Sequence, residues 1–160
     1  MIGSEIIAKS LKQQGVDTFF YIMGGPMMHV ELHSMAEGLR GIDVRHEQAG
    51  AMAAFAYARL LNRPGVCMAA SGPATTNLVT GVAHAWADCT PVIALGGASP
   101  DASTGRGVFQ EIEQLPMFEP CTKWCDRVHN AKRLPELINR AVREAMSGKP
   151  FRAPTHVAVD

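Results

Sequence analysis

The sequence predicts an α/β fold in which six parallel strands form one sheet that helices cover on both faces. Short apolar runs alternate with segments of helical periodicity along all 160 residues, which is typical of parallel α/β sheets. Each pair of successive parallel strands needs a helical crossover, and crossovers of one hand place helices on both faces. A chain of this length is usually one domain. We therefore expect a single three-layer domain over residues 1–160.

The first helix is predicted from Ser4 to about Gln14. Ser4 is a favourable capping residue, and Ile6, Ile7 and Leu11 follow it on one helical face.

The first strand is predicted over residues 17–22, and the Gly24-Gly25-Pro26 turn ends it. A second helix is expected over residues 28–37, with Gly38 just beyond its last residue. Residues 41–44 form the next expected strand.

The helix expected over residues 47–62 consists almost wholly of small and apolar residues. A strand at 65–70 follows, and then a helix at 74–87 that starts behind Ser71-Gly72-Pro73. The next strand is expected over residues 91–96.

Residues 99–114 are predicted to be a long loop, and loops of this length in compact domains usually bind something. Residues 122–128 and 155–159 form the last two predicted strands. Between them lies a helix at about 134–147, with Asn130 as its expected cap.

Composition excludes several classes of function. Hydrophobic residues make up 47% and charged residues 19% of the chain, and the formal net charge is zero. Such a balance is typical of a globular protein without a nucleic-acid-binding stripe. Neither a signal peptide nor a long apolar run occurs, so we expect no membrane segment and a cytoplasmic location. The four cysteines lie in apolar contexts and are expected to be reduced thiols.

Glu47 is the main candidate functional residue. It directly follows Arg45-His46 at the junction between a strand and a helix, and ligands bind at the carboxyl ends of strands in open α/β folds. We expect this carboxylate to be crowded and partly desolvated. A first-turn carboxylate also complements the positive end of its helix, so its position alone leaves both roles open.

A series of sequence blocks resembles one enzyme family. The blocks are residues 45–50 around Glu47, residues 71–78, residues 83–92, Phe109-Gln110-Glu111 and residues 155–160. In this order they are similar to the N-terminal, pyrimidine-binding domain of thiamine diphosphate enzymes of the acetolactate synthase and benzaldehyde lyase type. A catalytic histidine of the benzaldehyde lyase branch would fall near Pro26, so the mechanism of that branch is not expected.

The resemblance assigns roles to seven residues. Glu47 matches the glutamate that hydrogen-bonds the aminopyrimidine ring and activates the cofactor. Gly24 and Gly25 match a turn beside the cofactor, and Pro73 and Asn77 match a loop near the pyrimidine. Gly24 and Gly25 also suit a turn that ends a strand, and Asn77 also suits capping of the first helical turn. Phe109 and Gln110 match residues on the substrate side.

The resemblance also implies a partner. The diphosphate-binding half of the family carries Gly-Asp-Gly and holds Mg²⁺, and this chain has no Gly-Asp-Gly and no Walker loop. We therefore expect the chain to bind only the pyrimidine end of thiamine diphosphate. A partner domain or subunit would hold the Mg²⁺, and we expect no metal site in this chain. We expect the chain to be a fragment of a longer enzyme; a natural subunit is the alternative.

The leading hypothesis is one half of a decarboxylase or carboligase, a lyase or transferase that acts on a small 2-keto acid or acyl-CoA substrate. The half would function in a homo- or hetero-oligomer. A non-catalytic partner or regulatory module that keeps the fold is the alternative. A nucleotide-binding flavodoxin-like domain is a third hypothesis. It is disfavoured because the first strand–helix turn lacks a phosphate-binding glycine pattern.

Overall fold

A computed structural model describes residues 1–148 and 151–159. Lys149, Pro150 and Asp160 lie outside the described residues, and so do the parts of the sequence blocks that fall on them. Six strands form one all-parallel sheet in the order β2-β1-β3-β4-β6-β5. The strands are β1 (Thr18–Tyr21), β2 (Arg40–Asp43), β3 (Gly65–Ala69), β4 (Val92–Gly97), β5 (Trp124–Val128) and β6 (Thr155–Val159). The sequence prediction of a six-stranded parallel sheet is confirmed.

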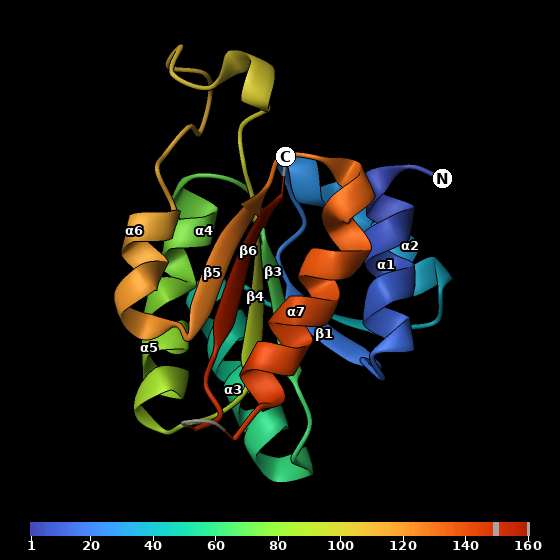
Figure 1. The fold of residues 1–160 in the computed structure, drawn as a ribbon, viewed down its shortest axis with the longest axis vertical. Helices are drawn as coiled ribbons and strands as arrows, with labels where there is room; N and C mark the ends of the chain where they lie inside the picture. The colour runs from blue at the N-terminus through green and yellow to red at the C-terminus, as the bar shows by residue number, and fades with distance from the viewer. Residues whose placement is uncertain (149–150, 160) are drawn as a thin grey trace.

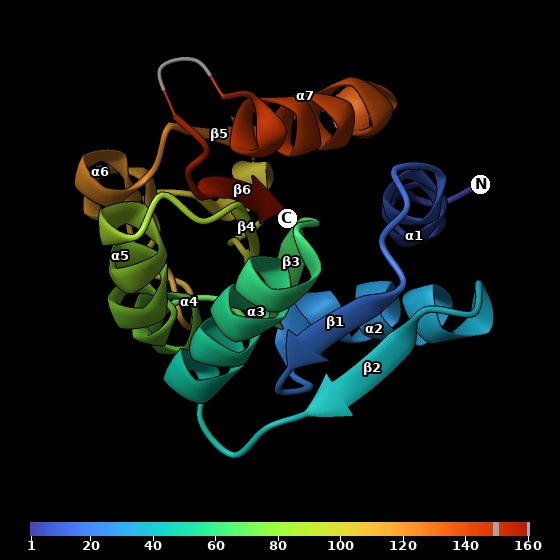
Figure 2. The ribbon, with the colours of Figure 1, turned by 90° about the horizontal axis from the view of Figure 1, so that it is seen from below.

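Helices cover both faces of the sheet, as Figures 1 and 2 show. One face carries α1 (Gly3–Gln13), α2 (Met28–Ala36) and α7 (Leu134–Met146). The other carries α3 (Glu47–Leu61), α4 (Pro73–Asn77), α5 (Val79–Ala87) and α6 (Leu115–Phe118). Single 3₁₀ turns stand at Gly25–Met27, Asp101–Ser103, Glu119–Cys121 and Ala131–Arg133.

The two faces of the sheet differ in the size of their side chains. Along β3 and β4, Val66, Met68, Ile93 and Leu95 point to the side of α1, α2 and α7, which we call the aliphatic face. The alternate positions point to α3 and α5 and are small; they include Cys67, Ala69 and Ala94. We call this side the small-residue face. The period of two along each strand therefore sorts large and small residues into separate layers.

The carboxyl ends of the strands meet at one edge of the sheet, because all six strands are parallel. Above that edge rises the segment 99–114, drawn in yellow in Figure 1. Apart from the 3₁₀ turn at Asp101–Ser103 it contains no regular element. We call it the arm.

Local differences from the sequence prediction have structural causes. Ile2, not Ser4, is the residue before α1, and the Ser4 hydroxyl instead lies 3.0 Å from Nδ1 of His33 on α2. The predicted helix 74–87 is divided at Leu78 into α4 and α5. The expected end of α2 is confirmed, since Gly38 follows it with a φ of 88°. Asn130 does not cap α7 itself: its side chain accepts a hydrogen bond from the Lys132 amide and so caps the 3₁₀ turn Ala131–Arg133 that leads into α7.

Candidate functional site

The turn between β2 and α3 places Glu47 at the carboxyl edge of the sheet. The ring of His46 caps α3, because its Nδ1 accepts a hydrogen bond from the Gln48 amide at 3.1 Å. In this geometry the proton of the neutral ring is on Nε2. Glu47 is the first residue of α3 and is half-buried. His46 is thus a helix cap, a role that the sequence prediction did not include.

Asn77 holds the Glu47 carboxylate. The Asn77 Nδ2 donates a hydrogen bond to Oε2 of Glu47 at 2.9 Å. Oε1 of Glu47 accepts no hydrogen bond from the residues that the structure describes, which leaves one oriented acceptor oxygen. Sequence reasoning offered two roles for Asn77, a ligand contact or a backbone cap, and the structure shows a third, a contact with the candidate carboxylate.

The short helix α4 places Asn77. Pro73 is its first residue, where a missing backbone N–H costs no helical hydrogen bond. The buried hydroxyl of Thr75 donates to the carbonyl of Ala70 at 2.6 Å, which ties α4 to the end of β3. Pro73 itself is exposed, and no hydrogen bond to a described residue fixes a ligand role for it.

The Gly24-Gly25 turn lies on the other side of the β3 end. A Cβ atom on Gly24 would stand 3.2 Å from that of Ala70, while one on Gly25 would meet open space. A hollow of about 300 Å³ opens beside this turn. Its lining consists of Gly25, Pro26, Ser71, Ala98, Ser99, Pro100, Phe109 and Gln110. The structure therefore brings Gly25, Phe109 and Gln110 together around one hollow.

Ser71 and Gly72 hold the arm against the sheet edge. The Ser71 hydroxyl donates to Oε1 of Gln110 at 3.0 Å. Gly72 has a φ of 60°, and a Cβ atom there would lie 2.5 Å from the Gln110 carbonyl oxygen, so only glycine fits. Gln110 also has a positive φ, 60°. Sequence reasoning missed this role of Ser71, because the contact spans 39 residues.

The arm is fixed by side chains at its base and along its length. Carboxylate oxygens of Glu111 accept hydrogen bonds from the amides of Gly105 and Val108. These bonds, the one from Gly105 foremost, lower the pKa of Glu111. Arg127 forms an ion pair with Asp101 at 3.1 Å. The arm thus presents Phe109 to solvent with 88% of its surface exposed.

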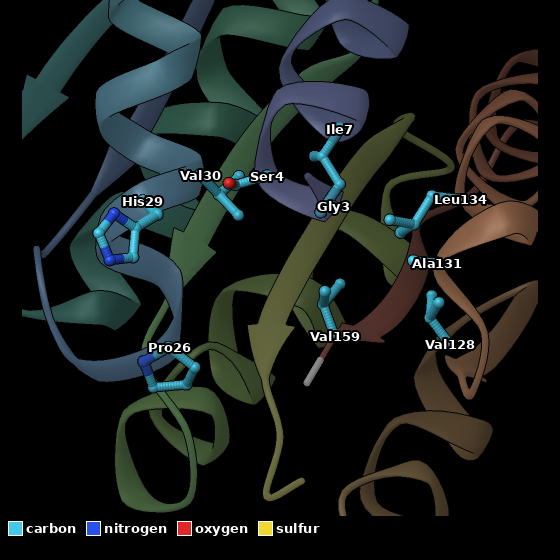
Figure 3. A pocket seen from close by; sticks show the side chains of 10 residues that line it. All are labelled: Gly3, Ser4, Ile7, Pro26, His29, Val30, Val128, Ala131, Leu134 and Val159. Atoms are coloured by element: carbon cyan, nitrogen blue, oxygen red, sulfur yellow. The ribbon is translucent and has the colours of Figure 1, made fainter. Parts of the chain in front are cut away.

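A second hollow of about 200 Å³ lies on the aliphatic face, where the first turns of α1, α2 and α7 converge (Figure 3). Its walls are mainly apolar, with Ser4 and His29 as the polar members. Pro26 lines both this hollow and the one beside the arm. None of the seven residues to which the resemblance assigns a role lines this second hollow.

No group of three or more His, Cys, Asp or Glu residues that could hold a metal ion occurs in ranges 1–148 and 151–159. Within the same ranges, no helix has the length and apolar character needed to cross a membrane.

Comparison with known proteins decides the family. The family model described as "Thiamine pyrophosphate enzyme, N-terminal TPP binding domain" matches residues 1–117. The chain belongs to this thiamine pyrophosphate enzyme family. The match includes β1 to β4, the Gly24-Gly25 turn, Glu47, Asn77 and the arm, while β5, α7 and β6 lie beyond it.

Relatives of the thiamine pyrophosphate enzyme family match nearly the whole chain. The probable acetolactate synthase large subunit of Methanocaldococcus jannaschii is 41% identical over 157 residues, which is 98% of this chain and 26% of the relative. The acetolactate synthase isozyme 2 large subunit of Escherichia coli is 39% identical over 94% of this chain and 27% of its own length. The 2-hydroxyacyl-CoA lyase 1 of Mus musculus is 36% identical over 92% and 26%. The chain thus spans about a quarter of the length of the curated relatives it matches.

Proposed function

We propose that this chain is the pyrimidine-binding half of a thiamine diphosphate-dependent decarboxylase or carboligase and that Glu47 activates the cofactor. The observation that carries the proposal is the Asn77–Glu47 hydrogen bond, because it leaves Oε1 of Glu47 as an oriented acceptor at the carboxyl edge of the sheet. Membership of the family supports the cofactor assignment.

The residues present fit the aminopyrimidine end of the cofactor. A ring nitrogen that carries a proton needs an acceptor, and a carboxylate provides a charge-assisted one. The Gly24-Gly25 turn offers bare backbone, with open space where a Gly25 side chain would be. When bound, the cofactor supplies the carbanion chemistry, while the protein supplies orientation and electrostatics.

Five residues of the candidate site have defined tasks in this proposal. Glu47 holds the proton at the ring nitrogen, and Asn77 keeps the carboxylate in one orientation. Phe109 and Gln110 stand on the substrate side of the hollow beside the Gly24-Gly25 turn, where a small 2-keto acid or acyl-CoA would enter. Pro73 places α4 beside the pyrimidine.

We propose that a partner domain or subunit binds the diphosphate and Mg²⁺. The support is that the matched relatives are about four times as long as this chain. An interface is available on α3, whose outward positions Ala49, Met52, Ala56 and Leu60 are exposed. Small and apolar exposed residues in one stripe favour contact with another chain or domain. We therefore expect a homo- or hetero-oligomer.

The test is the Glu47→Gln variant of the full-length enzyme, or of the chain assembled with its diphosphate-binding partner. Glutamine keeps the shape of the side chain but cannot take up a proton, so turnover should fall by about 10²- to 10⁴-fold while cofactor still binds. Glu144→Gln, on α7 of the aliphatic face, is the matched control and should keep full turnover. Near wild-type turnover of Glu47→Gln would refute the role of Glu47. No turnover in the wild-type assembly would indicate a non-catalytic module.

A further inference from the structure

Glu31 is a buried acid without a partner. It lies in the first turn of α2, its exposed surface is 0%, and neither carboxylate oxygen has a hydrogen-bond partner in the described part of the chain. An ionised carboxylate in such a place is costly, because neither water nor a cation compensates its charge. Burial, with a further contribution from the negative charge of Asp43, raises the pKa of Glu31 to about 8. At neutral pH the side chain is therefore mainly a neutral acid.

The groups that face Glu31 come from the two strands below it. Tyr21 ends β1 and Asp43 ends β2, and the two are paired in the register of the sheet. Burial raises the pKa of Tyr21, and the charges of Asp43 and Glu31 add to the increase. Asp43 forms an ion pair with Arg45.

The two lysines of α1 that contact the α2 region bind Glu37, at the end of α2 opposite to Glu31. Lys9 lies 4.0 Å from the Glu37 carboxylate, and Lys12 donates to the Glu37 carbonyl. In the last turn of α2, the Ser4 hydroxyl of α1 contacts Nδ1 of His33, and His29 stacks on His33 one helical turn away. Glu31 forms no ion pair with any residue that the structure describes, so a negative charge on its carboxylate would not be compensated.

The segments around Glu31, α2 and β2, are both connected through short turns to the proposed cofactor site. The 3₁₀ turn Gly25–Met27 joins the Gly24-Gly25 turn to the start of α2 at Met28. β2 ends at Asp43, four residues before Glu47, and it is an edge strand that pairs with β1 alone among the strands of residues 1–148 and 151–159. A repulsive charge between α2 and β2 would thus act on both segments at once.

We propose that Glu31 is a positioning residue: in its neutral form it lets α2 pack on the ends of β1 and β2, and its ionisation displaces the Gly24-Gly25 turn and the segment that carries Glu47. The importance of this displacement for catalysis rests on the proposed function. The displacement itself does not, because it follows from the repulsion between Glu31 and Asp43 and from the gain in hydration when the first turn of α2 moves outward. The device would reduce cofactor activation at alkaline pH.

The experiment compares the pH dependence of unfolding for the wild-type 160-residue chain and its Glu31→Gln variant. The folded state holds a proton on Glu31 up to about pH 8, whereas an ordinary glutamate loses it near pH 4.5. The folded state therefore binds more protons between these values, and stability falls as the pH rises. Relative to Glu31→Gln, the folding equilibrium constant of the wild type should fall by up to about tenfold per pH unit from pH 5 to pH 8. Parallel curves for the two proteins would overturn the proposal.

A second variant covers the case in which Glu31→Gln folds poorly. Glu31→Met removes both oxygens and keeps an unbranched side chain of similar length. Like Glu31→Gln, it should lack the fall in stability that the wild type shows between pH 5 and pH 8. A wild-type slope that persists in Glu31→Met would also overturn the proposal, since another group would then be the source.

Amide hydrogen exchange separates a positioning role of Glu31 from a general contribution to stability, because it reports which segments lose protection. Protection factors in residues 24–31 and 43–48 should fall in the wild type as the pH passes about 8, and they should stay constant in Glu31→Gln. Uniform loss of protection over the whole chain, or no difference between the proteins, would contradict a positioning role. The Glu47→Gln variant should retain the wild-type transition, because Glu31 is intact there. A failure of the cofactor proposal and a failure of the Glu31 proposal are thus distinguishable.

Discussion

The aliphatic and small-residue faces of the sheet use the same strands but hold their helices in different ways. On the aliphatic face, side chains such as Ile93 and Leu95 fill the space between the sheet and α7. On the small-residue face, backbone approaches backbone: a Cβ atom on Gly65 of β3 would lie 2.0 Å from the Ala54 carbonyl oxygen of α3. Large side chains can repack when a neighbour changes, whereas backbone contacts leave little freedom.

This difference explains where the candidate site lies. Glu47 begins α3 and Asn77 ends α4, and both helices belong to the small-residue face. The helix α5 that follows Asn77 is close to α3 as well, since a Cβ atom on Gly81 would stand 2.5 Å from that of Ala51. The separation of α3 from its neighbours is therefore set by main-chain contact, which fixes the hydrogen bond between the two site residues.

The largest effect on stability should come from a deletion on the aliphatic face. Ile93 is fully buried in β4, so Ile93→Ala removes three carbon atoms from a filled space. We expect a loss of about 2–5 kcal/mol in the free energy of unfolding, measured by urea denaturation. A loss below about 1 kcal/mol would show that this layer is not closely packed.

The opposite change should be harmful on the small-residue face. Gly65→Ala adds one methyl group against the α3 backbone, and we expect a loss of about 1–3 kcal/mol. Gly148→Ala is the matched control, because a Cβ atom there meets no atom within 4 Å. Equal stability of the two variants would contradict the claim that close backbone contact holds the small-residue face together. In the enzyme, Gly65→Ala should also reduce turnover, since α3 carries Glu47.

Each face also buries a side chain that gains or loses a proton between about pH 3 and pH 8, and the two side chains change stability in opposite directions. On the small-residue face, His156 is fully buried, stacks on Phe118 at 3.8 Å and bonds the Ala94 carbonyl through Nδ1. Burial lowers the pKa of His156 from 6.5 to about 3. The unfolded chain therefore binds an extra proton between these values, so stability falls as the pH drops from about 6.5 to 3, by up to about 1.4 kcal/mol per pH unit. Glu31 of the aliphatic face changes stability with the opposite sign above about pH 4.5.

The two slopes should largely cancel between about pH 4.5 and 6.5 in the wild type. In Glu31→Gln the slope of His156 should become visible in this range, and His156→Asn should remove it, since the asparagine amide can still donate to the Ala94 carbonyl. Urea denaturation at a series of pH values measures these slopes. A wild type that is already strongly pH-dependent between 4.5 and 6.5 would contradict this balance.

Local patterns in the sequence predicted most of the fold. Short apolar runs between helical segments identified all six strands, and the caps at Gly38 and Asn130 depend on neighbouring residues alone. The division at Leu78 could not be predicted in this way. No proline or glycine occurs there, and α4 is held by the bond from Thr75 to the end of β3. The short helix α6 was also missed, because four residues carry no periodic signal.

The candidate site was predicted in part. The position of Glu47 after a strand indicated the carboxyl edge, and the structure places it there. The hydrogen bond from Asn77 to Glu47 and the contact of Ser71 with Gln110 join segments 30 or more residues apart. Such contacts arise from the packing of the whole sheet, so no local pattern could reveal them. Glu31 likewise gave no signal, because a glutamate in the first turn of a helix is ordinarily exposed.

The role of Glu47 is tested most directly by a measurement of cofactor activation itself. In the assembled enzyme with thiamine diphosphate bound, the exchange of the thiazolium C2 proton with deuterium can be followed by quenched-flow NMR for the wild type, Asn77→Ala and Glu47→Gln. We expect exchange to be about 100-fold or more slower in Glu47→Gln, with a smaller reduction in Asn77→Ala, where the carboxylate is present but no longer held. Exchange at the wild-type rate in Glu47→Gln would contradict the central role given to this carboxylate.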